Sequence, residues 1–143
     1  MATVSIKFKK TNENAVIPSK NHSDDTGLDV TSVEDKIIPA RGSAIVDVGL
    51  MFAYIDHGFW VKVEGRSGLG FKHGICPHPG IIDQGYRGDA GIKLYNNTDV
   101  DYEVKAGDRI AQFVVYRNFS SVVSEGEIME SKRGSKGFGS SGK

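Results

Sequence analysis

Asp83 is the residue best placed by type and spacing to act as a general base. It follows two isoleucines and precedes a turn over residues 83–88. We therefore expect a carboxylate at the mouth of an apolar pocket, partly desolvated and within hydrogen-bond reach of a water. Tyr86 has a ring able to lie flat against a sugar or a base. The alternative is an Asx turn at Asp83 with Tyr86 in the core.

An anion-binding loop is indicated by residues 64–70 (EGRSGLG), which follow an apolar segment and lead into a helix predicted over residues 67–73. Backbone N–H groups at a helix start, the Ser67 hydroxyl and the Arg66 guanidinium together form a cradle for phosphate. A plain strand-to-helix turn capped by Ser67 accounts for the same residues. The Gly-Lys-Ser/Thr of a Walker loop is absent from this segment.

Two further polar positions have alternative interpretations. Gln112 lies inside the apolar run 109–116, so its side-chain amide needs a partner, and its chemistry alone favours a backbone group over a ligand. Asp29 lies close to Asp24 and Asp25. It is suited to hold a magnesium ion through water, or simply to solvate a loop.

Zinc and disulfide chemistry are disfavoured by the cysteine content. His73, Cys76 and His78 are close in sequence, but a fourth ligand is missing and the spacing matches no standard zinc site. A single cysteine excludes an internal disulfide and the Cys-x-x-Cys pair of a zinc nucleobase deaminase. The chain is therefore suited to a reducing compartment.

The last segment, residues 131–143, has a different composition from the rest. Phe138 is its one apolar residue, and glycines at positions 134, 137, 139 and 142 separate the others. Such a segment cannot bury enough surface to order itself, so we expect a mobile arm. It is able to close over a bound nucleotide, with Phe138 on the base and Arg133 on phosphate. The alternative is a tail without function.

Short strands are expected to position these groups. Polar and apolar residues alternate in several segments, and clusters of Asn, Asp, Gly and Pro separate them. We predict a single domain with a β-sandwich or barrel, not a βαβ sheet, and a hairpin over residues 79–96. The expected inward-facing residues are Val4, Ile6, Phe8, Ala44, Val46, Val48, Phe59, Val61, Val63, Ile92 and Leu94, with a central strand over residues 109–116.

Charge and hydropathy narrow the function classes. Eighteen basic and eighteen acidic residues cancel, so nothing draws the chain as a whole to nucleic acid or to an anionic membrane, and any anion site must be local. The N-terminus lacks the apolar core of a signal peptide, and the longest apolar run, residues 49–55, is far shorter than the ~18 residues of a membrane span. We expect a soluble intracellular protein of cytoplasm or nucleus, and a viral origin is compatible with this.

Five segments in this order resemble the motifs of the trimeric deoxyuridine triphosphatase (dUTPase) family. They are residues 26–30 (TGLDV), 65–69 (GRSGL), 80–88 (GIIDQGYRG), 107–112 (GDRIAQ) and 133–142 (RGSKGFGSSG). The resemblance implies an all-β, distorted jelly-roll-like barrel or sandwich with one short helix. It also implies a three-fold homotrimer whose active sites are shared between chains. Residues 1–130 would form the β domain and residues 131–143 a flexible C-terminal arm that closes an active site.

The same resemblance implies hydrolysis of dUTP to dUMP and pyrophosphate, which limits uracil in DNA and supplies dUMP for thymidylate synthesis. Asp83 would activate the water that attacks the α-phosphorus, and Tyr86 would pack under the deoxyribose. Mg²⁺ would bridge the triphosphate oxygens, with Asp29 reaching it through water. The other implied substrate contacts are Gly80, Ile82 and Gly91 on uracil, Arg66, Ser67, Gly68 and Gln112 on phosphate, and Arg133, Phe138, Gly139 and Ser140 in the lid.

Two other functions remain open at the level of sequence. A dCTP deaminase-type relative shares the fold and would release ammonia. A non-catalytic trimeric nucleotide-binding module would bind dUTP without turnover, although the intact Asp83 disfavours it.

Overall fold

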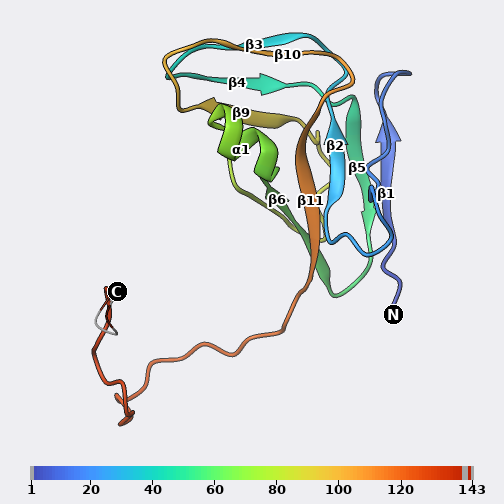
Figure 1. The fold of residues 1–143 in the computed structure, drawn as a ribbon. Helices are drawn as coiled ribbons and strands as arrows, with labels where there is room; N and C mark the ends of the chain where they lie inside the picture. Colours follow the sequence, from blue (N-terminus) through green and yellow to red (C-terminus); the bar gives the residue numbers. More distant parts are fainter. Residues whose placement is uncertain (1, 140–141, 143) are drawn as a thin grey trace.

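Strand β11 (Arg109–Arg117) is the central strand that its apolar run predicts. It pairs antiparallel with β2 (Leu28–Thr31) on one side and with β6 (Phe59–Glu64) on the other, and β8 (Gly80–Ile82) extends the sheet beyond β6. The computed structural model describes residues 2–139 and residue 142. Within that part of the chain, β11 is also the last strand before the chain leaves the body (Figure 1).

Three smaller sheets complete a jelly-roll-like, all-β body, as predicted. All of the paired strands run antiparallel, and they enclose one apolar core (Figure 1). The sheets are β1 (Ile6–Lys10) with β5 (Leu50–Ile55), β3 (Lys36–Ile38) with β10 (Tyr102–Val104), and β4 (Ser43–Val46) with β9 (Ile92–Asn96) and β7 (Ile75–Pro77).

Alternation along the strands builds the core. On β9, Ile92 and Leu94 are buried while Lys93 faces solvent, as a period of two residues requires. Two buried phenylalanines, Phe52 of β5 and Phe113 of β11, pack with their ring centroids 5.4 Å apart. This tilted aromatic contact joins two of the sheets and adds to the apolar area that folding removes from water.

Residues 79–96 do not form the hairpin that we predicted. β8 pairs with β6, whereas β9 pairs with β4 and β7 in another sheet. Between them, the backbone of Gly88 and Ala90 bonds to β5: Phe52 N–H donates to Gly88 O at 3.0 Å, and Ala90 N–H donates to Leu50 O at 2.9 Å. The loop therefore crosses from one sheet to another, because β8 and β9 each pair with other strands and not with each other.

Helix α1 (Ser67–His73) begins and ends where the sequence predicts. Its N-cap is Arg66, with extended backbone and no side-chain capping bond, so the interpretation of Ser67 as the cap is wrong. The helix ends at Gly74, whose positive φ of 63° suits glycine and lets its N–H bond back to Gly70 O. No helix within the described residues is long and apolar enough to cross a membrane.

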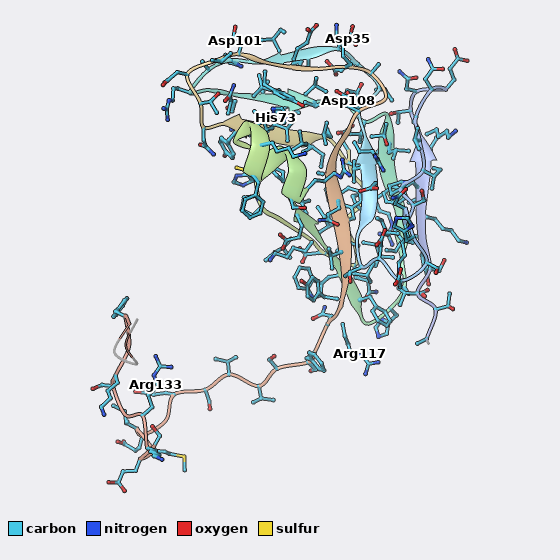
Figure 2. All side chains as sticks on the ribbon, in the orientation of Figure 1. Asp35, His73, Asp101, Asp108, Arg117 and Arg133 are labelled. Carbon is cyan, nitrogen blue, oxygen red and sulfur yellow. The ribbon has the colours of Figure 1, made fainter. Side chains whose placement is uncertain are left out.

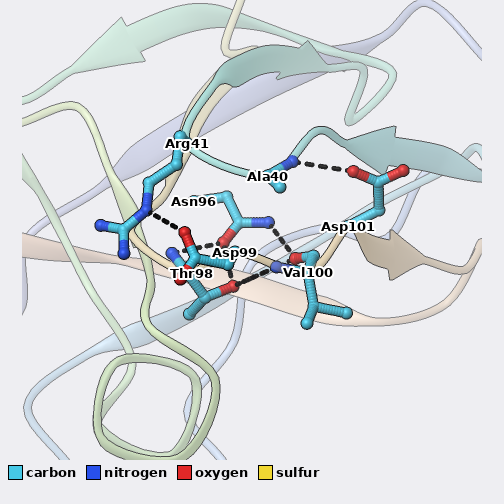
Figure 3. Close-up of polar contacts among 7 residues, drawn as sticks. All are labelled: Ala40, Arg41, Asn96, Thr98, Asp99, Val100 and Asp101. Atoms are coloured by element: carbon cyan, nitrogen blue, oxygen red, sulfur yellow. Dashed lines mark hydrogen bonds and ion pairs between the residues drawn. The ribbon is translucent and has the colours of Figure 1, made fainter.

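A buried amide, Asn96, ties together the loop between β9 and β10 (Figure 3). Its Nδ2 donates to Ile38 O at 3.0 Å and to Val100 O at 2.8 Å. Its Oδ1 accepts from the backbone N–H and the hydroxyl of Thr98. Only 2% of the residue is exposed, and both its Nδ2 and its Oδ1 are hydrogen-bonded to other groups of the protein.

Replacing Asn96 with alanine is expected to lower the free energy of unfolding by about 1–3 kcal/mol, because buried groups lose their hydrogen-bond partners. Urea unfolding measures this. The matched control is Asp99→Ala, which breaks the exposed Arg41–Asp99 pair beside it and should cost at most about 1 kcal/mol. Equal losses from the two variants would contradict this account of the buried network.

Candidate active site

Asp29 of β2 forms ion pairs with two arginines, Arg66 and Arg109. Arg66 Nε lies 3.3 Å from Asp29 Oδ1, and Arg109 Nη1 lies 3.4 Å from Asp29 Oδ2. Arg66 Nη1 also donates to Arg109 O at 3.3 Å. The Asp29 side chain is only 17% exposed, so its charge is screened less than that of a surface carboxylate. The three residues come from β2, from the start of α1 and from β11, and they form a preorganised cationic group.

A cavity of about 390 Å³ opens beside Arg66 and Asp29. It brings together Arg66, Ser67, Gly68 and Gln112, the four residues that we predicted to hold phosphate. Ser67 and Gly68 form the first turn of α1, where unpaired N–H groups favour an anion. The cavity therefore offers an anion the Arg66 guanidinium and the N–H groups of this turn, while Asp25 and Asp29 also line it.

Gln112 finds a backbone partner, which is the alternative that its chemistry favoured. Its Nε2 donates to Gly65 O at 2.8 Å and holds the loop before α1 against β11. Its Oε1 lies over Gly27, where a Cβ would stand 1.7 Å from that oxygen. Any side chain at position 27 would therefore force Gln112 to move.

A second cavity, of about 410 Å³, lies on another side of Arg66 and is also lined by Lys72, His73, Tyr102 and Asp108. Figure 2 shows His73 and Asp108 at this end of the body. Burial, and then the negative charge of Asp108, raise the pKa of Tyr102, so its hydroxyl stays neutral.

The loop that carries Asp83 is a tight turn, in which Tyr86 N–H donates to Asp83 O at 3.0 Å. Tyr86 is anchored as well, since its hydroxyl donates to Asp89 O at 2.8 Å and its ring packs on Phe52 with centroids 5.8 Å apart. The residue remains 39% exposed, so Tyr86 is held in place at the surface and does not belong to the core.

The Asp83 carboxylate is exposed, and it accepts no hydrogen bond from the residues that the structure describes. The Asx turn at Asp83 is therefore not formed. The partly desolvated setting that we expect for a general base is not supplied by this one chain.

The residues predicted to read uracil lie close to Asp83 in the chain, on both sides of the same crossing loop. Gly80 and Ile82 belong to β8, and Gly91 immediately precedes β9. The Gly91 N–H donates to Asp89 Oδ1 at 2.6 Å, so its donor is already used within the loop.

The residues predicted to hold phosphate and the residues of the Asp83 loop do not share a cavity in one chain. Within the described part of the chain, none of the three cavities lined by Arg66 includes Asp83. One chain therefore keeps the residues predicted to hold phosphate apart from the loop that carries Asp83.

The C-terminal segment lies away from both. From Asn118 to Gly139 the chain forms no helix or strand and projects from the body (Figures 1 and 2). Arg133 bonds only locally, through Nε to Lys136 O at 2.6 Å, and Phe138 is fully exposed. Gly139 is exposed as well, and Ser140 lies outside the described residues.

The residues present do not fit a resident metal site. Among residues 2–139 and 142, no three of the His, Cys, Asp and Glu side chains gather as metal ligands. His78 instead contacts the Tyr95 hydroxyl at 2.9 Å, and Cys76 accepts from Asn97. Both oxygens of Asp29 face guanidinium groups, a use of the carboxylate that competes with a cation.

Arg109 is the member of this cationic group that our sequence reasoning missed. It starts β11, and a charged residue at a strand end is ordinarily interpreted as solvent-exposed. Its partner Asp29 is 80 positions away, so no local pattern signals the pair. The one available signal was the acidic residue inside the apolar segment 28–30, which needs a cationic partner once it is partly buried.

Comparisons with known proteins agree on one family. The dUTPase family model matches residues 13–142. A deoxyuridine 5'-triphosphate nucleotidohydrolase of Helicobacter hepaticus is 43% identical over 99% of this chain and 91% of its own length. The enzyme of the same name from Solanum lycopersicum is 42% identical over 95% of this chain and 80% of its own length.

A solved structure is similar as well. The dUTPase of Staphylococcus bacteriophage 80alpha, determined with dUpNHpp, superposes with a TM-score of 0.87 at 28% identity, over 96% of this chain and 98% of that one.

Proposed function

This chain belongs to the dUTPase family, and we propose that its phosphate cradle and its Asp83 loop act together on dUTP. The protein is a hydrolase that converts dUTP to dUMP and pyrophosphate. The observation that carries the assignment of the site is the cavity in which Arg66, fixed by Asp29, stands beside Ser67, Gly68 and Gln112. The Arg66 guanidinium and the N–H groups at the start of α1 are the donors that this cavity offers to a triphosphate.

In the proposed mechanism, Asp83 accepts a proton from water as the water oxygen attacks the α-phosphorus. A new P–O bond forms, and the bond from the α-phosphorus to the bridging oxygen breaks, so pyrophosphate leaves with the electron pair. Arg66 and the N–H groups of Ser67 and Gly68 stabilise the charge on the phosphates. Tyr86 packs under the deoxyribose, and the backbone at Gly80, Ile82 and Gly91 contacts the uracil.

A homotrimer accounts for the separation of the two parts. In one chain Asp83 is exposed and lies outside the cavities that Arg66 lines. Two copies that face each other are able to bring Asp83 of one copy to the cradle of the next, and burial between them supplies the missing desolvation. Arg133, Phe138, Gly139 and Ser140 of the arm then close over the nucleotide.

Magnesium belongs with the substrate in this proposal. Asp29 already bonds to two arginines and, with the described residues around it, offers no set of ligands. We propose that Mg²⁺ arrives on the triphosphate oxygens, where it neutralises part of their charge.

The net charge of zero suits a free nucleotide better than a nucleic acid or a membrane. An intracellular location stays a prediction.

Pyrophosphate release from dUTP, dTTP, dCTP and UTP, each with and without Mg²⁺, tests this function. We expect rapid release from dUTP alone and a strong reduction without Mg²⁺. Ammonia release from dCTP would favour the deaminase-type alternative. Saturable dUTP binding without turnover would favour the non-catalytic module.

A further inference from the structure

The turn between β5 and β6 is fixed to the body from two sides. Asp56 Oδ2 accepts from Ser5 N–H at 2.7 Å, and Asp56 N–H donates to Ser5 O at 3.0 Å. Gly58 O accepts from Asn118 N–H at 2.7 Å, at the point where β11 ends. Backbone groups of Ser5 and Asn118, residues far apart in the sequence, therefore hold this turn in one position.

Gln84, the residue after Asp83, reaches across to the same turn. Its Oε1 accepts from Gly58 N–H at 3.0 Å, and its Nε2 lies 3.3 Å from His57 Nδ1. The Gln84 side chain thereby bridges 26 positions of sequence from the crossing loop to a fixed point. The bond to Gly58 is partly buried, so water competes with it less than with an exposed bond.

Hydrogen bonds within the turn connect Gln84 to Asp83. Tyr86 N–H closes the turn on Asp83 O at 3.0 Å. Arg87 Nη1 donates to Gln84 O at 2.8 Å and to Tyr86 O at 2.9 Å, which braces the turn from outside. Within the described residues nothing bonds to the Asp83 carboxylate itself, so the backbone of this turn sets the position from which that side chain extends.

We propose that Gln84 is the positioning residue for Asp83, an inference that rests on the proposed function. By bonding to Gly58 it holds the turn so that the carboxylate meets the attacking water. A displacement of about 1 Å at a reacting group costs on the order of 10²-fold in rate, so an anchor of this kind bears on turnover. The proposed substrate contacts on either side of Gln84 have anchors of their own, Tyr86 through Phe52 and Asp89 O and Ile82 through the pairing of β8 with β6, so the Gln84 anchor has little bearing on binding.

Gln84→Leu removes both hydrogen bonds at nearly constant volume. We expect kcat for dUTP to fall about 10-fold or more, in line with the loss that misplacement produces. KM and the thermal unfolding midpoint should stay close to those of the wild type. Gln84→Glu keeps an oxygen for the Gly58 N–H and should restore most of the lost kcat. The matched control is Asn97→Leu, an exposed amide in the loop after β9, which should leave kcat unchanged.

Hydrogen exchange over residues 83–88 provides a readout that does not depend on activity. The Tyr86 amide, which donates to Asp83 O, is expected to exchange faster in Gln84→Leu than in the wild type or in Gln84→Glu. Unchanged exchange, unchanged kcat, or a failure of Gln84→Glu to restore kcat would each overturn the positioning role. Failure of the wild type to hydrolyse dUTP would instead overturn the proposed function, and the exchange measurement would still decide the role of Gln84.

Discussion

Asp83→Asn is expected to bind dUTP with nearly unchanged affinity and to release pyrophosphate on the order of 10²–10⁴-fold more slowly than the wild type. Asparagine keeps the size and polarity of the side chain but accepts no proton from water. The Asp83 side chain makes no hydrogen bond within the described residues, so its replacement disturbs no network. Rapid-quench measurement of pyrophosphate with saturating Mg–dUTP isolates the chemical step, and calorimetric titration gives the affinity.

The control for this variant is Glu13→Gln, which neutralises an exposed carboxylate in the loop before β2. It should leave both rate and affinity unchanged. Near-normal turnover by Asp83→Asn would remove Asp83 from the mechanism. A loss of affinity as large as the loss of rate would make Asp83 a binding group and not the base.

Local patterns predicted the parts of the fold whose physical cause is local. The helix over residues 67–73 follows from a glycine-rich start and a glycine that ends it, and the central strand over 109–116 follows from a continuous apolar run. The hairpin over 79–96 was wrong because strand pairing is a tertiary choice. β6 offers an edge to β8, and β4 and β7 flank β9. No periodicity within the segment records those partners.

The candidate site likewise contains contacts that could be predicted from local sequence and contacts that could not. The backbone partner of Gln112 could be predicted, since an amide in an apolar strand must be satisfied nearby. The pairing of Asp29 with Arg109 could not, because it joins residues 80 positions apart through the register of β2 and β11. The exposure of Asp83 in one chain was not predicted, because the two preceding isoleucines suggested an apolar pocket, yet Ile81 is itself exposed.

A chain that ends after Glu130 is expected to fold and assemble like the full chain and to lose kcat/KM for dUTP by a factor on the order of 10² or more. β11 ends at Arg117, and Arg133 and Phe138 make no contact with the body, so the truncation removes nothing from the core. It removes the cation and the ring proposed to close over the nucleotide. Thermal unfolding, size-exclusion chromatography with light scattering, and steady-state kinetics measure the three properties.

Ending the chain after Glu130 distinguishes a loss of the lid from a loss of assembly. It keeps the exposed apolar side chains of the segment that follows β11, which a neighbouring copy is able to cover: Phe119, Val122, Val123, Ile128 and Met129. In the full chain, Phe138→Ala should reproduce part of the kinetic loss through lost stacking, whereas Lys132→Ala, outside the proposed lid contacts, should not. Normal turnover by the truncated chain would exclude the lid. A monomer would instead show that residues 131–143 act in assembly, because the apolar segment alone would then be insufficient to hold the copies together.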